Sequence, residues 1–344
     1  MAAVWGIHND ALTTELVEGG FVSIGWEKIG DILKIGPDRE ALKVAQKTAY
    51  PETKPGAIPV QAGTLYRFAF GIDIGDVIVA PYRPNSTINI GVVTGPYQYL
   101  PGAPLHPHRR PVQWKKLGIA RAVFSQPALN EIGSAITLFR VKKHAAEFLA
   151  VINSAGDLTE VDQTAVEQAP ADDAEEPVDE PRVSRVDRYT RDFVLEQLKF
   201  PNLQHHEFEQ FTAAVLRSLG YQARVTQYSQ DGGVDVIAHR DPLGIEPPIM
   251  KVQCKHTTAT IGGPQVHQLV GTLGANELGV FVTLGTYSND ALHIERGEQR
   301  LRLLSGEALV DLVLANYAAL DPEWHQRVPL TQLLVVNDLD ATGG

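Results

Sequence analysis

The chain of 344 residues is 44% hydrophobic and 21% charged, which is typical of folded globular proteins, and its length suffices for two compact domains. No apolar stretch is long enough to cross a bilayer, and the N-terminus lacks the basic start and apolar run of a secretory signal. We therefore expect a cytoplasmic protein without a membrane partner. The formal net charge of −11, taken alone, argues against a nucleic-acid partner.

The acidic residues are unevenly distributed along the chain. Positions 145 to 181 hold eleven Asp and Glu residues and no Lys or Arg, so the remaining sequence has 30 acidic and 30 basic residues. That remainder is neutral overall and can carry local basic patches. Because the acidic stretch is also rich in Ala and Pro, we interpret residues 156–186 as a flexible acidic linker between two domains.

The first predicted domain covers residues 1–155 and is mainly β. Apolar and polar residues alternate in short runs bounded by Gly, Pro and Asn, a pattern that indicates strands. The expected strands are 21–26, 76–82 and 87–94, and the expected helices are 38–48 and 142–153. The pattern predicts a small β-structure with a few helices.

The second predicted domain covers residues 187–344 and mixes helices with strands. It opens with helical patterns, among them an apolar series from Phe208 to Leu219 that ends at Gly220. Strands are expected around Arg224, Asp235 and Gln253 and at 279–284 and 301–304, with helices at 263–273, 289–299 and 306–316. This alternation predicts a layered α/β domain.

Asp235, Gln253 and Lys255 form a candidate catalytic group in the second domain. Met250, Val252 and Cys254 alternate with polar residues, so Gln253 and Lys255 are expected to point to the same side of one strand. Asp235 lies on the preceding strand, just after two glycines. The only cysteine, Cys254, falls on the apolar side, which favours a buried thiol over a nucleophile.

This residue set suits the hydrolysis of a phosphodiester. The reaction needs a divalent cation held by oxygen ligands, and a positive charge near the developing negative charge. Asp235 can be a ligand, and Lys255 can supply the charge. Gln253 can ligate through its carbonyl oxygen but brings no negative charge, so a second carboxylate is wanted, and Glu209 is the best candidate. Glu209 could equally be an ordinary solvated helix residue.

Five motifs of this domain, in the same order, resemble the catalytic domain of the Mrr family of restriction endonucleases, in the PD-(D/E)xK nuclease superfamily. The motifs are Glu207-Phe-Glu-Gln-Phe, Leu216-Arg-Ser-Leu-Gly-Tyr, Asp231-Gly-Gly-Val-Asp-Val-Ile-Ala, Val252-Gln-Cys-Lys and Pro264-Gln-Val-His-Gln-Leu. The resemblance implies a restriction-endonuclease-like fold that uses Mg²⁺ or Mn²⁺. It implies that Asp235 binds the metal, that Gln253 and Lys255 form a Gln-x-Lys variant, and that Glu209 and Gln265 complete the site. Asp231 is better explained as shaping the Gly-Gly turn.

The first domain more loosely resembles the PUA-like β-barrels, including the EVE group. The segments that carry this likeness are Val4-Trp-Gly-Ile, Ile24-Gly-Trp, Gly75-Asp-Val-Ile-Val and Gly91-Val-Val-Thr-Gly-Pro-Tyr-Gln-Tyr. The resemblance implies recognition of nucleic acid, in some members through a modified or flipped base in an aromatic pocket. Trp26, Trp5 or Tyr66 could stack on such a base. The alternative is that these rings fill the core of a small barrel.

A basic and aromatic cluster lies near the end of the first domain, at His106-Pro-His-Arg-Arg-Pro-Val-Gln-Trp-Lys-Lys. Arg109, Arg110, Lys115 and Lys116 could grip DNA phosphates without reading sequence. The two arginines could equally belong to a solvated loop before a strand.

Together these features predict a metal-dependent endonuclease that restricts foreign or modified double-stranded DNA. Cutting both strands requires two active sites, so a homodimer or larger assembly is expected. Two alternatives stay open. In one, the first domain senses a small nucleotide-like ligand and thereby controls the nuclease. In the other, the protein binds DNA without cutting it.

Overall fold

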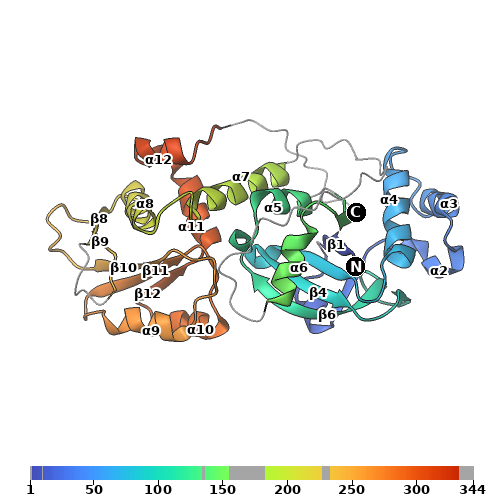
Figure 1. Ribbon diagram of the computed structural model, residues 1–344, viewed down its shortest axis with the longest axis horizontal. Helices are drawn as coiled ribbons and strands as arrows, with labels where there is room; N and C mark the ends of the chain where they lie inside the picture. Colours follow the sequence, from blue (N-terminus) through green and yellow to red (C-terminus); the bar gives the residue numbers. More distant parts are fainter. Residues whose placement is uncertain (1, 10, 134–135, 155–182, 227–232, 333–344) are drawn as a thin grey trace. The chain divides into compact units, whose positions relative to one another are not determined.

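The computed structural model describes residues 2–9, 11–133, 136–154, 183–226 and 233–332. The chain forms two compact units (Figure 1). The first holds the described residues up to Ile119 and from Pro127 onward to position 154, and the second holds Ala120–Gln126 and the described residues from position 183 onward. Among the described helices, none is long and apolar enough to span a bilayer.

The first unit is built on a mixed sheet of seven strands. The strands are β1 (Val4–Ile7), β2 (Phe21–Ile24), β3 (Val77–Tyr82), β4 (Thr87–Val93), β5 (Gln98–Tyr99), β6 (His108–Ile119) and β7 (Leu138–Val141). Their order is β2-β6-β4-β3-β1-β7, and β5 pairs with β6. Only β1 and β3 run parallel, while the other pairs are antiparallel.

Six α-helices accompany this sheet in the described residues. They are α1 (Thr14–Glu18), α2 (Ile32–Ile35), α3 (Arg39–Ala49), α4 (Ala57–Tyr66), α5 (Gln126–Ile132) and α6 (Ala145–Asn153). The start of α3 follows from Asp38, whose carboxylate accepts the backbone N–H of Glu40 at 2.8 Å. The prediction of a mainly β barrel is thus confirmed only as far as a mixed sheet, because helices make up much of the unit.

The second unit has a five-stranded sheet in the order β12-β11-β10-β9-β8. The strands are β8 (Gln222–Val225), β9 (Val236–His239), β10 (Ile249–Lys255), β11 (Glu277–Thr283) and β12 (Leu301–Leu304). Strands β10, β11 and β12 are parallel, and β8 and β9 form an antiparallel extension. The helices are α7 (Val183–Leu198), α8 (His205–Ser218), α9 (Gly263–Gly271), α10 (Asn289–Gly297), α11 (Gly306–Ala315) and α12 (Pro322–Arg327).

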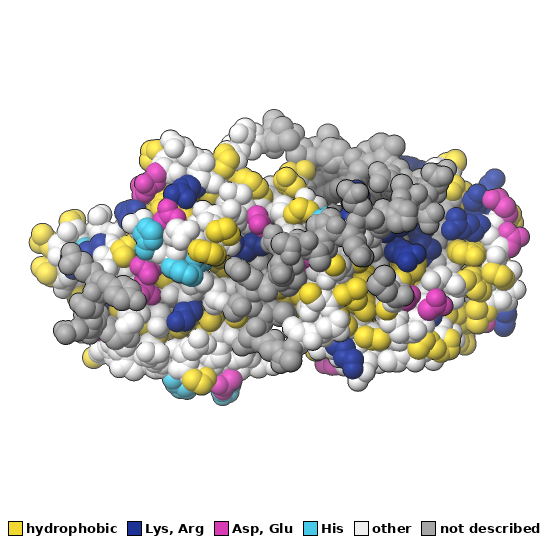
Figure 2. Space-filling view, viewed as in Figure 1, with side chains coloured by type: hydrophobic (Ala, Val, Ile, Leu, Met, Phe, Trp, Pro, Cys, Tyr) yellow, Lys and Arg dark blue, Asp and Glu magenta, His cyan; other side chains and the backbone are white. Residues whose placement is uncertain are grey.

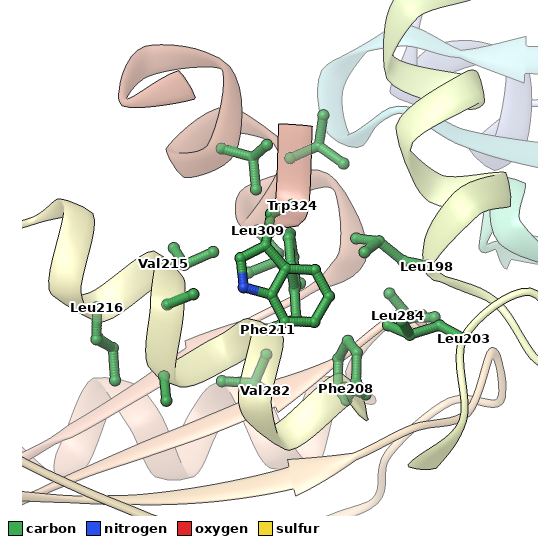
Figure 3. Close-up of a cluster of buried hydrophobic side chains, with 14 of the residues drawn as sticks. Leu198, Leu203, Phe208, Phe211, Val215, Leu216, Val282, Leu284, Leu309 and Trp324 are labelled. Atoms are coloured by element: carbon green, nitrogen blue, oxygen red, sulfur yellow. The ribbon is translucent and has the colours of Figure 1, made fainter. Parts of the chain in front are cut away.

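Helices cover both faces of this sheet (Figure 1). On one face, Phe208 and Phe211 of α8 pack with Val236, Val252 and Val282 of the strands. Figure 3 shows this cluster, in which the rings of α8 lie beside Trp324 of α12. Helices α9 and α10 cover the other face around the fully buried Phe281. Each buried ring of this kind stabilises the fold by about 1.5–3 kcal/mol, so the cluster fixes α8 firmly against the strands.

Most predicted elements are confirmed to within one to three residues, and β12 lies at its predicted residues. The predictions gave no range for β1, β5, β7, α1, α2, α4, α5 and α12. A strand was expected only after Arg110, and the alternative that Arg109 and Arg110 form a loop is wrong, because β6 begins at His108 and includes both arginines. Most of the predicted linker falls outside the described residues, and α7 begins at Val183, inside the range that we interpreted as linker. The segment Ala120–Gln126 groups with the second unit, although its sequence position suggested the first.

Candidate active site

Asp235 immediately precedes β9, and both its backbone and its side chain form hydrogen bonds with β10. Its N–H donates to the carbonyl of Val252 at 2.8 Å, and the N–H of Cys254 donates to its Oδ2 at 2.6 Å. The regular pairing of β9 with β10 ends at Val236 and Val252. Beyond it, the bond from the Cys254 N–H places the Asp235 carboxylate against the backbone between Gln253 and Lys255, so the structure brings Asp235 to this end of β10.

The carboxamide of Gln253 lies close to Gly233, and its oxygen is a buried hydrogen-bond acceptor. A Cβ atom on Gly233 would stand 3.1 Å from Nε2 of Gln253, and Gly233 has a φ of 89°, so glycine fits here for both reasons. Oε1 of Gln253 is buried and has no hydrogen-bond partner. A buried acceptor without a hydrogen bond lowers the stability of the folded protein unless a ligand or an ordered water donates a hydrogen bond to it or binds it.

Lys255 is the last residue of β10, and its side chain is exposed. It lies two residues beyond Gln253 on the same strand and within electrostatic reach of Asp235, whose pKa its positive charge lowers. An exposed ammonium beside a half-buried carboxylate is available to a phosphate. The predicted set of Asp235, Gln253 and Lys255 therefore lies together at one end of β9 and β10.

Glu209 joins this set from α8. It shares one helix face with His205, one turn before it, and with Thr212, one turn after it. Thr212 lies within hydrogen-bond reach of the Cys254 thiol, so this face of α8 runs along the end of β10. Glu209 is half-buried, and the charge of Asp235 acts on it.

Both carboxylates are costly to keep ionised without a cation. Burial raises the pKa of Asp235, although the Cys254 N–H and Lys255 act in the opposite direction. Burial also raises the pKa of Glu209, and the neighbouring charge of Asp235 raises it further. Two partly desolvated acids that repel each other form an environment that a divalent cation would relieve. Burial likewise raises the pKa of the Cys254 thiol well above its usual range, which fits the predicted inert thiol.

The donor set fits a hard divalent cation. Asp235 and Glu209 offer carboxylate oxygens, and the buried Oε1 of Gln253 offers a third oxygen without a competing protein partner. Mg²⁺ and Mn²⁺ bind such oxygen ligands and retain several waters. Within the described ranges, no cluster of three or more His, Cys, Asp or Glu side chains has the geometry to hold a metal, so Gln253 would have to complete the site.

Three further residues of the matched motifs are Gln265, Asp231 and Gly232. Gln265 is exposed near the start of α9, and its Oε1 accepts the N–H of Gly262 at 3.1 Å. This hydrogen bond stabilises the beginning of the helix. Asp231 and Gly232 lie outside the described residues.

Replacement of Gln253 by Ala is expected to weaken divalent-cation binding by about tenfold or more, because it removes an oxygen positioned beside Asp235. The thermal midpoint of the protein, measured against Mn²⁺ concentration, gives the affinity. Gln253→Glu adds a negative charge and is expected to bind the cation more tightly. Gln222→Ala, at an exposed glutamine of β8, is the matched control. A Gln253→Ala titration that overlays the wild-type curve would remove Gln253 from the ligand set.

Two of the residues predicted to contact nucleic acid are inside the first unit. Trp5 is 5% exposed, and its indole N–H donates to Oδ2 of Asp76 at 2.8 Å. Arg110 is 4% exposed, and its guanidinium donates to the carbonyl oxygens of Phe68 and Ala69 at 2.6 and 2.9 Å. Both side chains thus already hold protein partners, and the contacts visible here are those of core residues.

The other predicted residues of the first unit are more accessible, but the structure does not gather them into one site. Trp26 and Tyr66 are half-buried and pack against the edge of the core. The guanidinium of Arg109 lies 4.1 Å from the ring centre of Phe21. Lys116 donates to the carbonyl of Ser154 at 2.9 Å, and Lys115 is exposed.

The first unit also contains a pocket that the sequence did not reveal. Its lining is mostly apolar, with two rings and four small polar side chains, and comprises Ile7, Asn9, Leu12, Thr13, Leu16, Val17, Val22, Ser23, Ala80, Pro81, Tyr82, Asn89 and Trp114. The Asn9 amide donates to the Ser23 hydroxyl at 2.9 Å, and the Trp114 indole donates to the Leu16 carbonyl at 2.9 Å. Trp5, Trp26 and Tyr66 are not among the lining residues. Its residues come from separate strands and helices, so no local sequence signal marks it.

Comparison with protein families gives a separate match for each unit. Residues 200–313 match the Mrr_cat family, described as a restriction endonuclease, and residues 3–139 match a domain of unknown function, DUF8426. The type IV methyl-directed restriction enzyme EcoKMrr of Escherichia coli (strain K12) is 30% identical over 132 residues. The match covers 36% of this chain and 42% of EcoKMrr, so the chain spans less than half the length of this relative.

Two solved structures show a weaker overall likeness. The MspJI restriction endonuclease in complex with a 27-mer oligonucleotide has a TM-score of 0.33 at 15% identity, over 94% of this chain and 71% of that one. The DNA modification-dependent restriction endonuclease AspBHI has a TM-score of 0.32 at 14% identity, over 80% and 73% of the two chains. TM-scores this low carry no argument about the whole chain. The family match and the identity to EcoKMrr show a restriction endonuclease domain of the Mrr type at residues 200–313 of the second unit.

Proposed function

We propose that the protein is a metal-dependent endonuclease of double-stranded DNA, with its active site at Asp235, Gln253, Lys255 and Glu209. The observation that carries the proposal is the buried, unpartnered Oε1 of Gln253 at the end of β10 where the Asp235 carboxylate accepts the Cys254 N–H, with Lys255 exposed on the same strand. This arrangement lies in the domain that matches restriction endonucleases. It suits metal-assisted phosphodiester hydrolysis.

Each residue has a defined part in this reaction. A bound Mg²⁺ or Mn²⁺ supplies the polarisation of the phosphate and an activated water. Asp235 and Glu209 hold the cation through carboxylate oxygens, and Gln253 completes the oxygen set or orients a water. The exposed ammonium of Lys255 binds a phosphate oxygen and stabilises the negative charge that develops during attack.

The first unit is proposed to recognise the DNA feature that triggers cutting, such as a modified or flipped base. The support is its looser resemblance to PUA-like domains and the fact that EcoKMrr, which is similar to part of this chain, is a methyl-directed restriction enzyme. Trp26 and Tyr66, both half-buried, are the rings proposed to meet a base, and Arg109 and Lys115 the cations proposed to contact phosphates. Trp5, Arg110 and Lys116 would support these contacts from within the fold.

The corresponding biological role is the restriction of foreign or modified DNA in the cytoplasm. Each chain has one proposed site, so a double-strand cut would need two copies, as in a homodimer or larger assembly.

A second candidate function is a nuclease controlled by a small nucleotide-like ligand. The pocket of the first unit has the chemistry for it, because Tyr82 and Trp114 can stack on a ring, and Asn9, Ser23 and Asn89 can bind polar edges. Its cavity of about 20 Å³ is much smaller than a nucleotide, so the pocket would have to open to admit such a ligand. In that case cleavage would require the ligand and ignore DNA modification. A protein that only binds DNA would have no need for the acidic and amide oxygens gathered around Asp235.

The function is tested by incubating matched plasmids, with and without methylated or hydroxymethylated bases, with the protein and Mg²⁺. The wild type is expected to cut the modified plasmid. Lys255→Ala is expected to lose about 100- to 1000-fold in rate, because an exposed charge at the reacting phosphate is removed. Arg224→Ala, which removes an exposed cation from the edge strand β8, should cut at the wild-type rate.

The outcomes separate the two units. Equal cutting by the wild type and Lys255→Ala would refute the active site. Equal cutting of both plasmids would refute recognition of modification by the first unit and leave the nuclease intact. Full discrimination by Trp26→Ala would exclude that ring from the recognition site.

A further inference from the structure

Four aromatic rings form a ladder beside the proposed active site. Phe200 stacks on His205 with centroids 5.8 Å apart, His205 meets His256 edge to face at 5.0 Å, and His256 stacks on Phe208 at 4.7 Å. Phe200 is 47% exposed, whereas Phe208 is fully buried. The ladder therefore extends from the solvent into the core, with two imidazoles in its middle.

Hydrogen bonds fix the proton positions of the two imidazoles. Nε2 of His256 lies 2.6 Å from the Leu198 carbonyl, which can only accept, so this nitrogen carries a proton. Burial lowers the pKa of His256 and keeps its ring neutral, so its Nδ1 has a lone pair. Nδ1 of His205 lies 3.1 Å from that atom and must be the donor. The nitrogen of His205 left for a ligand is Nε2, on an exposed side chain.

The ladder lies at the border of the proposed active site. His205 is one helical turn from Glu209 on the same face of α8, and His256 follows Lys255 in the chain. The ring of His205 is thus held on the α8 face that carries Glu209, close to the end of β10. Its orientation is set in advance by His256 on one side and Phe200 on the other.

The surroundings of His205 combine several titratable groups. Those on the neighbouring elements are His206 and Glu209 on α8 and Lys255 and His256 at the end of β10. Glu207 is already paired with Arg327, so its charge is compensated. Figure 2 shows histidine side chains gathered on this unit, with Lys and Arg nearby.

We propose that His205 binds a DNA backbone phosphate next to the scissile one, through an Nε2–H gained from solvent on binding, and that His256 positions it. This inference rests on the proposed nuclease function. Histidine exchanges protons near neutral pH, and the field of DNA phosphates favours the charged ring. The charged His205 keeps its Nδ1–H bond to His256 and gains a second, outward donor for the phosphate.

The test measures binding of a fluorescent DNA duplex by anisotropy in Ca²⁺, at about pH 6 and about pH 8. The wild type is expected to bind about tenfold more tightly at the lower pH, the effect of one charge-assisted hydrogen bond. His205→Ala is expected to bind weakly at both pH values and to lose most of this difference. His205→Arg, with a permanent charge, is expected to bind tightly at both. His256→Phe keeps a ring in the ladder but removes the acceptor, so the pH difference should shrink.

Controls keep the result specific to His205. His267→Ala, at an exposed histidine of α9, should retain the wild-type pH difference. A wild-type pH difference retained by His205→Ala overturns the inference, and so does His205→Arg binding no better than His205→Ala at the higher pH. Wild-type binding without pH dependence overturns only this inference. A wild type that neither binds nor cuts duplex DNA overturns the proposed function as well.

Discussion

Asp235→Asn is expected to abolish Mg²⁺-dependent DNA cleavage while making the metal-free protein more stable at neutral pH. The rate should fall at least about a thousandfold, the scale seen when an electrostatic group leaves a preorganised site. The fold should persist, because an Asn side chain can still accept the Cys254 N–H that now bonds Oδ2 at 2.6 Å. Cleavage of a plasmid and the thermal midpoint in a chelator measure the two effects.

The gain in stability follows from the direction of the pKa shift. The folded-state pKa of Asp235 is raised, chiefly by burial, above its ordinary value of 3.8. A group with a raised folded-state pKa contributes stability below its unfolded pKa, and that contribution is lost as the pH rises through the folded value. At neutral pH the buried charge is therefore a cost that Asn removes. The advantage of the variant should shrink as the pH falls toward the ordinary Asp value.

A metal titration separates loss of a ligand from a general defect. Mn²⁺ should raise the thermal midpoint of the wild type and leave that of Asp235→Asn nearly unchanged. Glu246→Gln, which neutralises an exposed acid in the turn between β9 and β10, is the matched control and should keep both activity and the Mn²⁺ response. An Asp235→Asn protein that cuts DNA, or that is stabilised by Mn²⁺ as the wild type is, would contradict the assignment.

The core of this site could be predicted because its signal is local. Alternation along β10 sets Gln253 and Lys255 on one side of the strand, and the glycines before Asp235 mark its approach to the neighbouring strand. These residues are also close in sequence, because Asp235 and Gln253 are 18 positions apart. The role of Glu209 could be predicted only from the resemblance to the Mrr family. An acidic residue on an amphipathic helix has no neighbouring sequence feature that distinguishes a metal ligand from a solvated side chain.

The features that sequence reasoning missed depend on contacts between distant residues. His205 and His256 are 51 positions apart, and nothing in either segment indicates that their rings meet. Trp5 and Arg110 were plausible nucleic-acid contacts by composition, but tertiary packing buries both side chains. The type of a residue shows that its side chain can stack on a base or donate a hydrogen bond. Only the fold shows whether that side chain already contacts other parts of the protein.

Breaking the buried ion pair between Arg121 and Asp192 is expected to destabilise the second unit strongly. The guanidinium donates to both carboxylate oxygens at 2.6 Å, and the side chains are 5% and 2% exposed. Asp192→Ala would leave the Arg121 charge buried without a partner, and we expect the second unit to lose about 3–5 kcal/mol of unfolding free energy. Urea unfolding followed by circular dichroism measures the loss.

The stability of the second unit therefore depends on a segment that lies outside residues 200–313, the range that matches the Mrr_cat family. Arg121 belongs to Ala120–Gln126, which directly follows β6 of the first unit, so a fragment starting at Val183 would carry Asp192 without its partner. The double variant Arg121→Met with Asp192→Leu should recover most of the stability, because apolar side chains can fill the space of a buried ion pair. Asp321→Ala, which breaks the exposed pair with Arg217, should cost less than about 1 kcal/mol. Equal losses in Asp192→Ala and Asp321→Ala would show that burial gives the Arg121 pair no special weight.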